Sequence, residues 1–313
     1  MLMRKLLAAS AMSLVMGVAA TAALAADGEA CKKVRVAEAG GWTDNTATNG
    51  FFTTVLKGLG YETSVDLLAL PVILESLKNK DLDVFLDNWM PSQTAEMKPY
   101  IEEKTVDSIG ANLEGAGYGP VVPQYAADAG VKDLKDLGKF TEKFDGKFYG
   151  IEPGNDGNRI VQAKIDDPAN GLDGWEMVES SEQGMLVQAE KAISKNEFVA
   201  FLAWTPHPIM GKMPLHYLSG FEADGFGGAT VYTLSRSGYS AECPNVGALL
   251  KNLKFSLDQE SALMEAIIGG KDGEAAAAEW LKANPAVLDA WLAGVTTLDG
   301  NDGLAAVKAS LGL

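Results

Sequence analysis

Three tryptophans stand where apolar, strand-like runs of the sequence give way to loops. Trp42 follows the run at 33–39, Trp89 follows the run at 82–88, and Trp204 follows the run "FVAFLA". A single tryptophan is usually a core residue, but strand ends expose loops, so three tryptophans at the same topological position indicate a cleft. Aromatic ring faces attract a cation by about 0.5–2 kcal/mol each, depending on desolvation. The chemistry that these residues could perform is therefore the binding of a cation.

Three further residues could complete such a cage. Asp44 lies two residues after Trp42, Asn155 follows the run "FYGIEPG", and Tyr118 lies in the glycine- and proline-rich passage 114–130. A quaternary ammonium has a charge shielded by methyl groups and no N–H to donate, so ring faces suit it better than ordinary hydrogen bonding does. The sequence therefore predicts the ligand-binding residues Trp42, Asp44, Trp89, Tyr118, Asn155 and Trp204.

The elements that would hold these residues alternate between strands and helices. Apolar runs at 33–39, 62–68 and 82–88 predict strands, and the amphipathic stretches between them predict helices over 49–61 and 71–80. This alternation is typical of parallel β-α-β units, and ligands of open α/β sheets bind beyond the carboxyl ends of the strands. We therefore expect an α/β fold in which one edge of the sheet carries the cage.

The chain length of 313 residues suggests two domains or one large one. The passage 114–130 is too polar for a core strand and is expected to cross between domains, with a return near 227–239. From residue 244 onward the pattern is helical. Trp175, Trp280 and Trp291 lie in helical or helix-flanking stretches and are expected in the core.

The first 25 residues have the pattern of a secretory signal peptide. Arg4 and Lys5 precede an apolar run that ends in the small-residue cleavage box at 23–25. A membrane anchor is the alternative, but the run is mostly small residues and no basic stop-transfer cluster follows it. Since export leads to an oxidising compartment, the only two cysteines, Cys31 and Cys243, predict one disulfide. Two unpaired buried thiols are the other possibility.

Composition and motifs argue against several other classes of function. The formal net charge of −16 disfavours nucleic acid and anionic membranes as partners. The only histidines are His207 and His216, and neither stands in a metal-ligand spacing. His207 is expected to be a structural loop residue, and Asp156 a solvated surface charge. No nucleophile elbow, P-loop or dinucleotide fingerprint occurs, so we expect no catalytic residue, no cofactor and no metal.

Four motifs together resemble one family of transport proteins. They are "GWTDNTATN", "DNW", "EPGNDGN" and "AWTPHP", and they span most of the chain in order. They are similar to motifs of periplasmic substrate-binding proteins of ABC importers for choline, glycine betaine and related quaternary amines, most of all the choline-binding members. The resemblance implies a periplasmic protein with the two-lobed, type II-like binding-protein fold, a membrane permease as partner, and an aromatic box at the six residues named above.

On this resemblance, the chain divides into three parts after the signal peptide 1–25. Residues 26–117 form the first part of lobe 1, residues 118–225 form lobe 2, and residues 226–313 return to lobe 1. The ligand cleft lies between the lobes. The alternatives are a binding protein of the same family for a zwitterion such as glycine betaine or carnitine, and, less favoured, a secreted enzyme that acts on a quaternary amine.

The type of ligand depends on Asp44. Choline is a cation with a hydroxyl, whereas glycine betaine also carries a carboxylate that needs donors. A carboxylate about 4 Å from a cation gains roughly 1–4 kcal/mol, and it repels a second carboxylate comparably. Asn155 suits either ligand. Beyond the leader, the sequence has only the arginines Arg35, Arg159 and Arg236, with Arg159 near a predicted cleft loop. We therefore expect choline.

Overall fold

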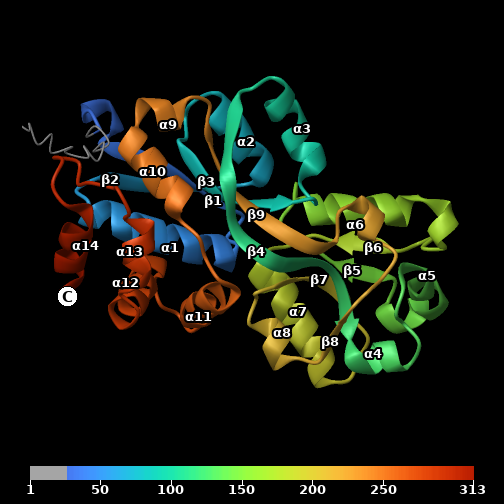
Figure 1. Ribbon diagram of the computed structural model, residues 1–313. Coiled ribbons are helices and arrows are strands. Elements are labelled where there is room, and N and C mark those ends of the chain that lie inside the picture. Colours follow the sequence, from blue (N-terminus) through green and yellow to red (C-terminus); the bar gives the residue numbers. More distant parts are fainter. Residues whose placement is uncertain (1–26) are drawn as a thin grey trace, which may run out of the picture.

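The computed structural model describes residues 27–313 and shows two lobes joined by long strands (Figure 1). A nine-stranded mixed sheet runs through both lobes in the order β2-β1-β3-β9-β4-β7-β5-β6, with β8 paired to β4. The predicted signal peptide 1–25 lies outside the described residues. Within residues 27–313, none of the helices combines the length and the apolar character needed to cross a membrane.

The first lobe is built on the parallel strands β1, β2 and β3. These strands and the helices that follow them are β1 (Lys33–Ala39), α1 (Thr43–Gly58), β2 (Glu62–Leu68), α2 (Leu70–Lys78), β3 (Val84–Met90) and α3 (Thr94–Glu102). β1 pairs with both β2 and β3, as the alternating pattern predicts. Helix α1 begins six residues before the predicted start at residue 49, because its first turn consists of weak helix formers that the apolar period does not reveal.

The second lobe contains the shorter parallel strands β5, β6 and β7. Strand β5 pairs with β6 and β7. The elements of this lobe are α4 (Gln124–Asp128), α5 (Leu134–Leu137), η2 (Gly138–Phe144), β5 (Lys147–Tyr149), α6 (Asp156–Asp166), η3 (Pro168–Asn170), β6 (Glu176–Val178), α7 (Glu182–Ser194), β7 (Ala200–Thr205), α8 (Ile209–Lys212), β8 (Leu215–Tyr217) and η4 (Glu222–Asp224).

Two long antiparallel strands, β4 (Val106–Pro123) and β9 (Gly227–Arg236), run from one lobe into the other (Figure 1). The prediction that passage 114–130 contains no core strand is wrong, because β4 continues through Tyr118 to Pro123. The glycines reflect a bend instead of a loop: Gly115 has a φ of +78°, and the register with β9 shifts between Leu113 and Ala116.

The C-terminal helices return to the first lobe, and the later ones pack against α1 (Figure 1). Phe51 of α1 packs edge-on against Trp280 and Trp291, with ring centroids 5.4 Å apart in both pairs, and Trp291 is buried as predicted. These helices are α9 (Tyr239–Glu242), α10 (Pro244–Asn252), α11 (Leu257–Ile268), α12 (Gly273–Ala283), α13 (Val287–Trp291) and α14 (Gly303–Leu311).

A disulfide joins the start of the described chain to this returning segment. Cys31 in the short helix η1 (Glu29–Cys31) is bonded to Cys243, and their Cα atoms lie 5.6 Å apart. The predicted pairing is confirmed. The two cysteines are 212 residues apart in the sequence, so the segment that the bond closes into a loop contains the whole second lobe.

Candidate functional site

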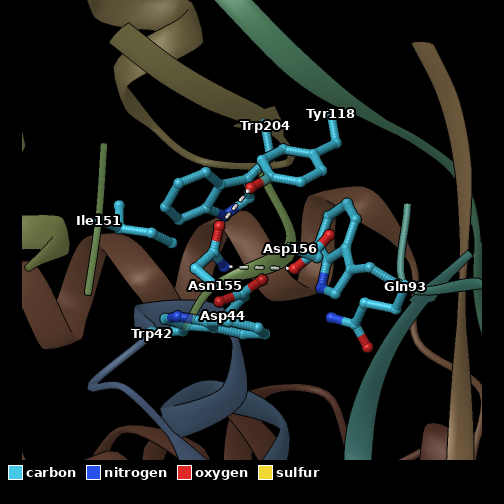
Figure 2. Close-up of a pocket in the computed structure, with 9 residues that line it drawn as sticks. Trp42, Asp44, Gln93, Tyr118, Ile151, Asn155, Asp156 and Trp204 are labelled. Atoms are coloured by element: carbon cyan, nitrogen blue, oxygen red, sulfur yellow. Dashed lines mark hydrogen bonds between the residues drawn. The ribbon is translucent and has the colours of Figure 1, made fainter. Parts of the chain in front are cut away.

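One cavity between the lobes is lined by all six residues predicted to bind the ligand. Trp42 and Asp44 face Trp204 and Tyr118 across it (Figure 2). The lining residues are Trp42, Asp44, Trp89, Gln93, Tyr118, Ile151, Asn155, Asp156 and Trp204.

The four aromatic rings come from four different elements. Trp42 is the N-cap residue of α1, Trp89 is next to last in β3, Tyr118 lies within β4, and Trp204 is next to last in β7. The ring centroids of Trp89 and Tyr118 are 5.8 Å apart, and those of Tyr118 and Trp204 are 6.3 Å apart at 79°. Trp89 and Trp204 thus end their strands rather than lying in the following loops. Three walls of the cavity are therefore rings carried by strands, and the fourth is the ring at the start of α1.

Carboxylates fix two of the indole rings. Trp42 Nε1 donates to both carboxylate oxygens of Glu152 at 3.0 Å, and Trp89 Nε1 donates to Asp87 Oδ1 at 2.9 Å. Both tryptophans are almost fully buried. Their edges are therefore satisfied within the protein, and their faces remain for contact with a ligand.

Asp44 is a buried carboxylate with an unused oxygen. It lies in the first turn of α1, and its Oδ1 has no hydrogen-bond partner among residues 27–313. Burial, and then the nearby negative charge of Glu182, raise the pKa of Asp44 to about 8. A buried polar atom without a partner is costly. A ligand that brought a positive charge and a hydroxyl donor would remove both penalties.

Asn155 is held by its own helix and by the cage. Its side-chain Oδ1 accepts the Asn158 N–H at 3.1 Å, which caps α6, and the Tyr118 hydroxyl at 3.2 Å. Its Nδ2 donates to Asp156 Oδ1 at 3.3 Å (Figure 2). Because Oδ1 already accepts from two donors, Asn155 orients Tyr118. What it can offer a ligand is mainly the remaining N–H of its Nδ2 group.

Three lining residues escape the sequence prediction. Gln93 follows β3, the strand that carries Trp89, Ile151 precedes the "EPGNDGN" motif, and Asp156 lies inside that motif. The expectation of a solvated Asp156 is wrong: it is 1% exposed, and burial raises its pKa to about 6. The position of Asp156 next to Asn155 is the one signal that could have identified it, since successive residues at a helix start share its environment.

Further acidic groups surround the cavity, whereas the basic group considered in the sequence is engaged elsewhere. Burial raises the pKa of Glu152 to about 7 and that of Asp87 well above its usual range. Arg159 forms an ion pair with Glu96 on α3 and does not line the cavity. In the described part of the chain, no group of three or more potential ligands could hold a metal ion. The site can stabilise positive charge but offers no ionic partner for an anion.

The comparisons with known proteins agree with this geometry. Residues 32–283 match the family model described as the substrate binding domain of the ABC-type glycine betaine transport system. The chain belongs to this family. Its members are substrate-binding proteins of transporters, so the predicted resemblance and the two-lobed binding-protein fold are confirmed.

Solved structures of the same fold carry quaternary amines. An ABC-transporter choline-binding protein in complex with choline is 50% identical, with a TM-score of 0.89 over 91% of this chain and 100% of that one. The unliganded, semi-closed form of an ABC-transporter choline-binding protein gives a TM-score of 0.83 at 51% identity, again over 91% and 100% of the two chains. Lactococcal OpuAC, closed on glycine betaine, is 27% identical, with a TM-score of 0.75 over 83% of this chain and 99% of that one.

The matches to relatives found by sequence cover a smaller part of this chain. An uncharacterized protein of Chromohalobacter salexigens is 48% identical over 130 residues, which are 42% of this chain and 83% of that protein. The glycine betaine/carnitine transport binding protein of Listeria monocytogenes is 29% identical over 169 residues, or 54% of this chain and 55% of that one. The second of these relatives is named for the zwitterionic amines glycine betaine and carnitine.

Proposed function

We propose that this protein binds choline in the aromatic cage and delivers it to the permease of an ABC importer. The observation that carries the proposal is a buried carboxylate, Asp44, with an unpartnered oxygen beside four aromatic rings. Four rings supply roughly 2–8 kcal/mol before entropy costs, and micromolar affinity requires about 8 kcal/mol. Attraction between Asp44 and the ammonium adds roughly 1–4 kcal/mol. The 50% identity to a protein solved with choline supports the same ligand.

The charge balance of the cavity favours a cation over a zwitterion. None of the lining residues in the described chain is basic, whereas Asp44 and Asp156 are acidic and Glu152 touches Trp42. A quaternary ammonium would bring the single positive charge to this group of carboxylates. The carboxylate of glycine betaine would enter the same low-dielectric space and be repelled.

One observation favours glycine betaine as a second candidate. Gln93 Nε2 and Trp204 Nε1 are buried donors without partners among residues 27–313, and a ligand carboxylate needs such donors. Gln93 Oε1 accepts from Asn88 Nδ2 at 2.8 Å, which leaves its amide group as a donor. The family model and the lactococcal structure also carry the name of this ligand.

The transport cycle follows from the two lobes. We place the hinge where β4 and β9 pass between them, which agrees with lobe parts at 26–117, 118–225 and 226–313. Residues 1–25 act as a cleaved signal peptide and direct the protein to the periplasm. There the closed, loaded form docks on the permease and undergoes no chemical reaction with its ligand.

Calorimetric titration with choline, acetylcholine, glycine betaine and carnitine tests the proposal. We expect choline to bind most tightly, tryptophan fluorescence to change on binding, and the ligand to be recovered unaltered. A preference for glycine betaine over choline would support the second candidate. Consumption of any of the four amines would indicate an enzyme and contradict the assignment.

A further inference from the structure

Helix α1, which carries two residues of the cage, lacks a side-chain cap of its own. Its N-cap residue is Trp42, which makes no side-chain capping bond, whereas helices usually begin at Ser, Thr, Asp or Asn. Glu182, the first residue of α7 in the second lobe, takes that role. Its Oε2 accepts the Thr43 N–H at 2.9 Å, and its Oε1 accepts the Thr43 hydroxyl. A carboxylate also suits the positive end of the helix dipole.

Glu182 is itself held in a defined orientation. It is 1% exposed, and His207 Nε2 lies 3.3 Å from its Oε1. Because His207 Nδ1 accepts the Ile209 N–H at 3.1 Å, the ring proton lies on Nε2 and is donated to Glu182. The histidine of "WTPHP" thus fixes the carboxylate that caps α1.

Glu152 makes the second contact from the same lobe to the same turn. Both of its oxygens accept the Trp42 Nε1–H. The glycines before Trp42 make room for it: a Cβ on Gly40 would lie 2.4 Å from the carboxyl carbon of Glu152, and Gly40 has a φ of +46°. The glycine-rich junction of the sequence therefore accommodates a carboxylate from the other lobe.

These contacts join one lobe to the other across the cleft. Arg159 of α6 pairs with Glu96 of α3, and Lys212 of α8 pairs with Glu265 of α11, so the two lobes meet on both sides of the cleft. Opening the cleft would separate Glu182 from Thr43. The first turn of α1 would then lose its cap.

We propose that Glu152 and Glu182 are positioning residues, which orient Trp42 and Asp44 against the ligand as the lobes close. The inference rests on the proposed function and deepens it. Closure completes the cage, because the second lobe supplies both the cap of α1 and the acceptor for the Trp42 indole. The pair therefore governs how slowly the closed form releases its ligand, whereas encounter with the open form does not involve these contacts.

Glu152→Asp and Glu182→Asp test the inference, because they keep the charge and shorten the reach by one methylene. Glu190→Asp is the matched control, since Glu190 is exposed on the same helix as Glu182. In stopped-flow fluorescence with choline, we expect each of the first two variants to raise the dissociation rate constant about tenfold. The association rate constant should stay within about twofold, and the control should match wild type.

A second set of variants changes the first-lobe residues that make these contacts. Thr43→Val removes the hydroxyl donor and should speed dissociation, whereas Thr43→Ser should not. Trp42→Phe keeps a ring but removes the indole N–H, so Glu152→Asp should have little additional effect in that background. The Thr43 pair tests the cap even where a Glu182 variant does not fold.

The possible outcomes separate this inference from the proposed function. Wild-type protein that binds none of the four amines would refute the proposed function and this inference with it. Normal choline binding with wild-type dissociation in Glu152→Asp, Glu182→Asp and Thr43→Val would overturn the inference alone. An equal effect of Glu152→Asp in the Trp42→Phe background would show that Glu152 does not act through the indole.

Discussion

At the scale of single residues, the proposed cage depends on the faces of its aromatic rings. Trp89 donates its N–H to Asp87, so replacing the ring removes cation attraction and apolar contact and also leaves Asp87 Oδ1 without this donor. Trp89→Ala and Trp204→Ala should each weaken choline binding by roughly 1–3 kcal/mol in calorimetry. The melting temperature should change less than the affinity, because these rings line a cavity. Normal affinity in both variants would assign these tryptophans to the core.

Asp44 decides between the two kinds of quaternary amine. Asp44→Asn keeps the shape of the side chain and removes its charge. Choline affinity should fall by about tenfold, since the lost attraction amounts to roughly 1–4 kcal/mol. The preference for choline over glycine betaine should narrow, because the variant no longer repels the betaine carboxylate. Titration of wild type and variant with both ligands gives the two ratios, and equal ratios would remove Asp44 from this role.

At the scale of elements, the start of α1 and the start of α6 perform the same task from opposite lobes. Each follows a strand of its own lobe and presents a carboxylate to the cavity, Asp44 from α1 and Asp156 from α6. Asn155 caps α6 from within its own sequence, whereas α1 receives its cap from Glu182. Local sequence therefore accounts for one helix start, and the contact between lobes accounts for the other.

The disulfide should matter for the first lobe and not for the site. Cys31 lies before the amino end of β1 and Trp42 follows its carboxyl end, so a seven-residue strand separates them, which is a length of about 23 Å. Replacing Cys31 and Cys243 with Ser should lower the free energy of unfolding by roughly 2–5 kcal/mol, measured by chemical denaturation. Choline affinity measured in the absence of denaturant should be unchanged, and a large loss would show that the bridge shapes the cleft.

At the scale of the whole molecule, closure gathers acidic groups. Asp44 faces Glu182 of α7 and Glu152 of the loop before α6 across the cleft, and burial with these charges raises its pKa to about 8. Asp87 of β3 and Glu260 of α11 belong to the lobe of Asp44, and burial and then the charge of Asp44 raise the pKa values of both. A raised carboxyl pKa means that the closed form binds more protons than an open form with an ordinary pKa near 4. The preference for closure without ligand is therefore greatest near pH 4 and is lost as pH rises through about 8.

The pH dependence of closure can be tested on the ligand-free protein. Small-angle scattering should show a larger radius of gyration at pH 8 than at pH 5, because ionised carboxylates in the closed cleft repel one another. With saturating choline the radius should be small at both pH values, since the cation supplies the missing positive charge. A ligand-free radius that does not change with pH would contradict the electrostatic account of closure.

The sequence by itself determined the alternation of strands and helices and the cysteine pair, and it predicted the six residues that together line one cavity. The hydrophobic period and the pattern of a signal peptide can be recognised from neighbouring residues, so they do not depend on how the lobes are arranged. Trp42, Trp89 and Trp204 could be recognised because strand ends meet at one edge of a sheet. The junction "AGGWTDNTATNG" even shows that something must cover its tryptophan.

Only the tertiary structure decided what covers it. Glu152 is 110 residues away from Trp42, and Glu182 is 139 residues away from Thr43, and no periodic pattern links positions so far apart. Polar groups such as Asp156 read as solvated in the sequence because their burial depends on the facing lobe. The strand through Tyr118 was hidden for a similar reason: distant strands hold its glycines extended, β9 as far as Tyr118 and β7 from Gly117 to Val121. Pro120 is tolerated because it lies beyond the residues that pair with β9.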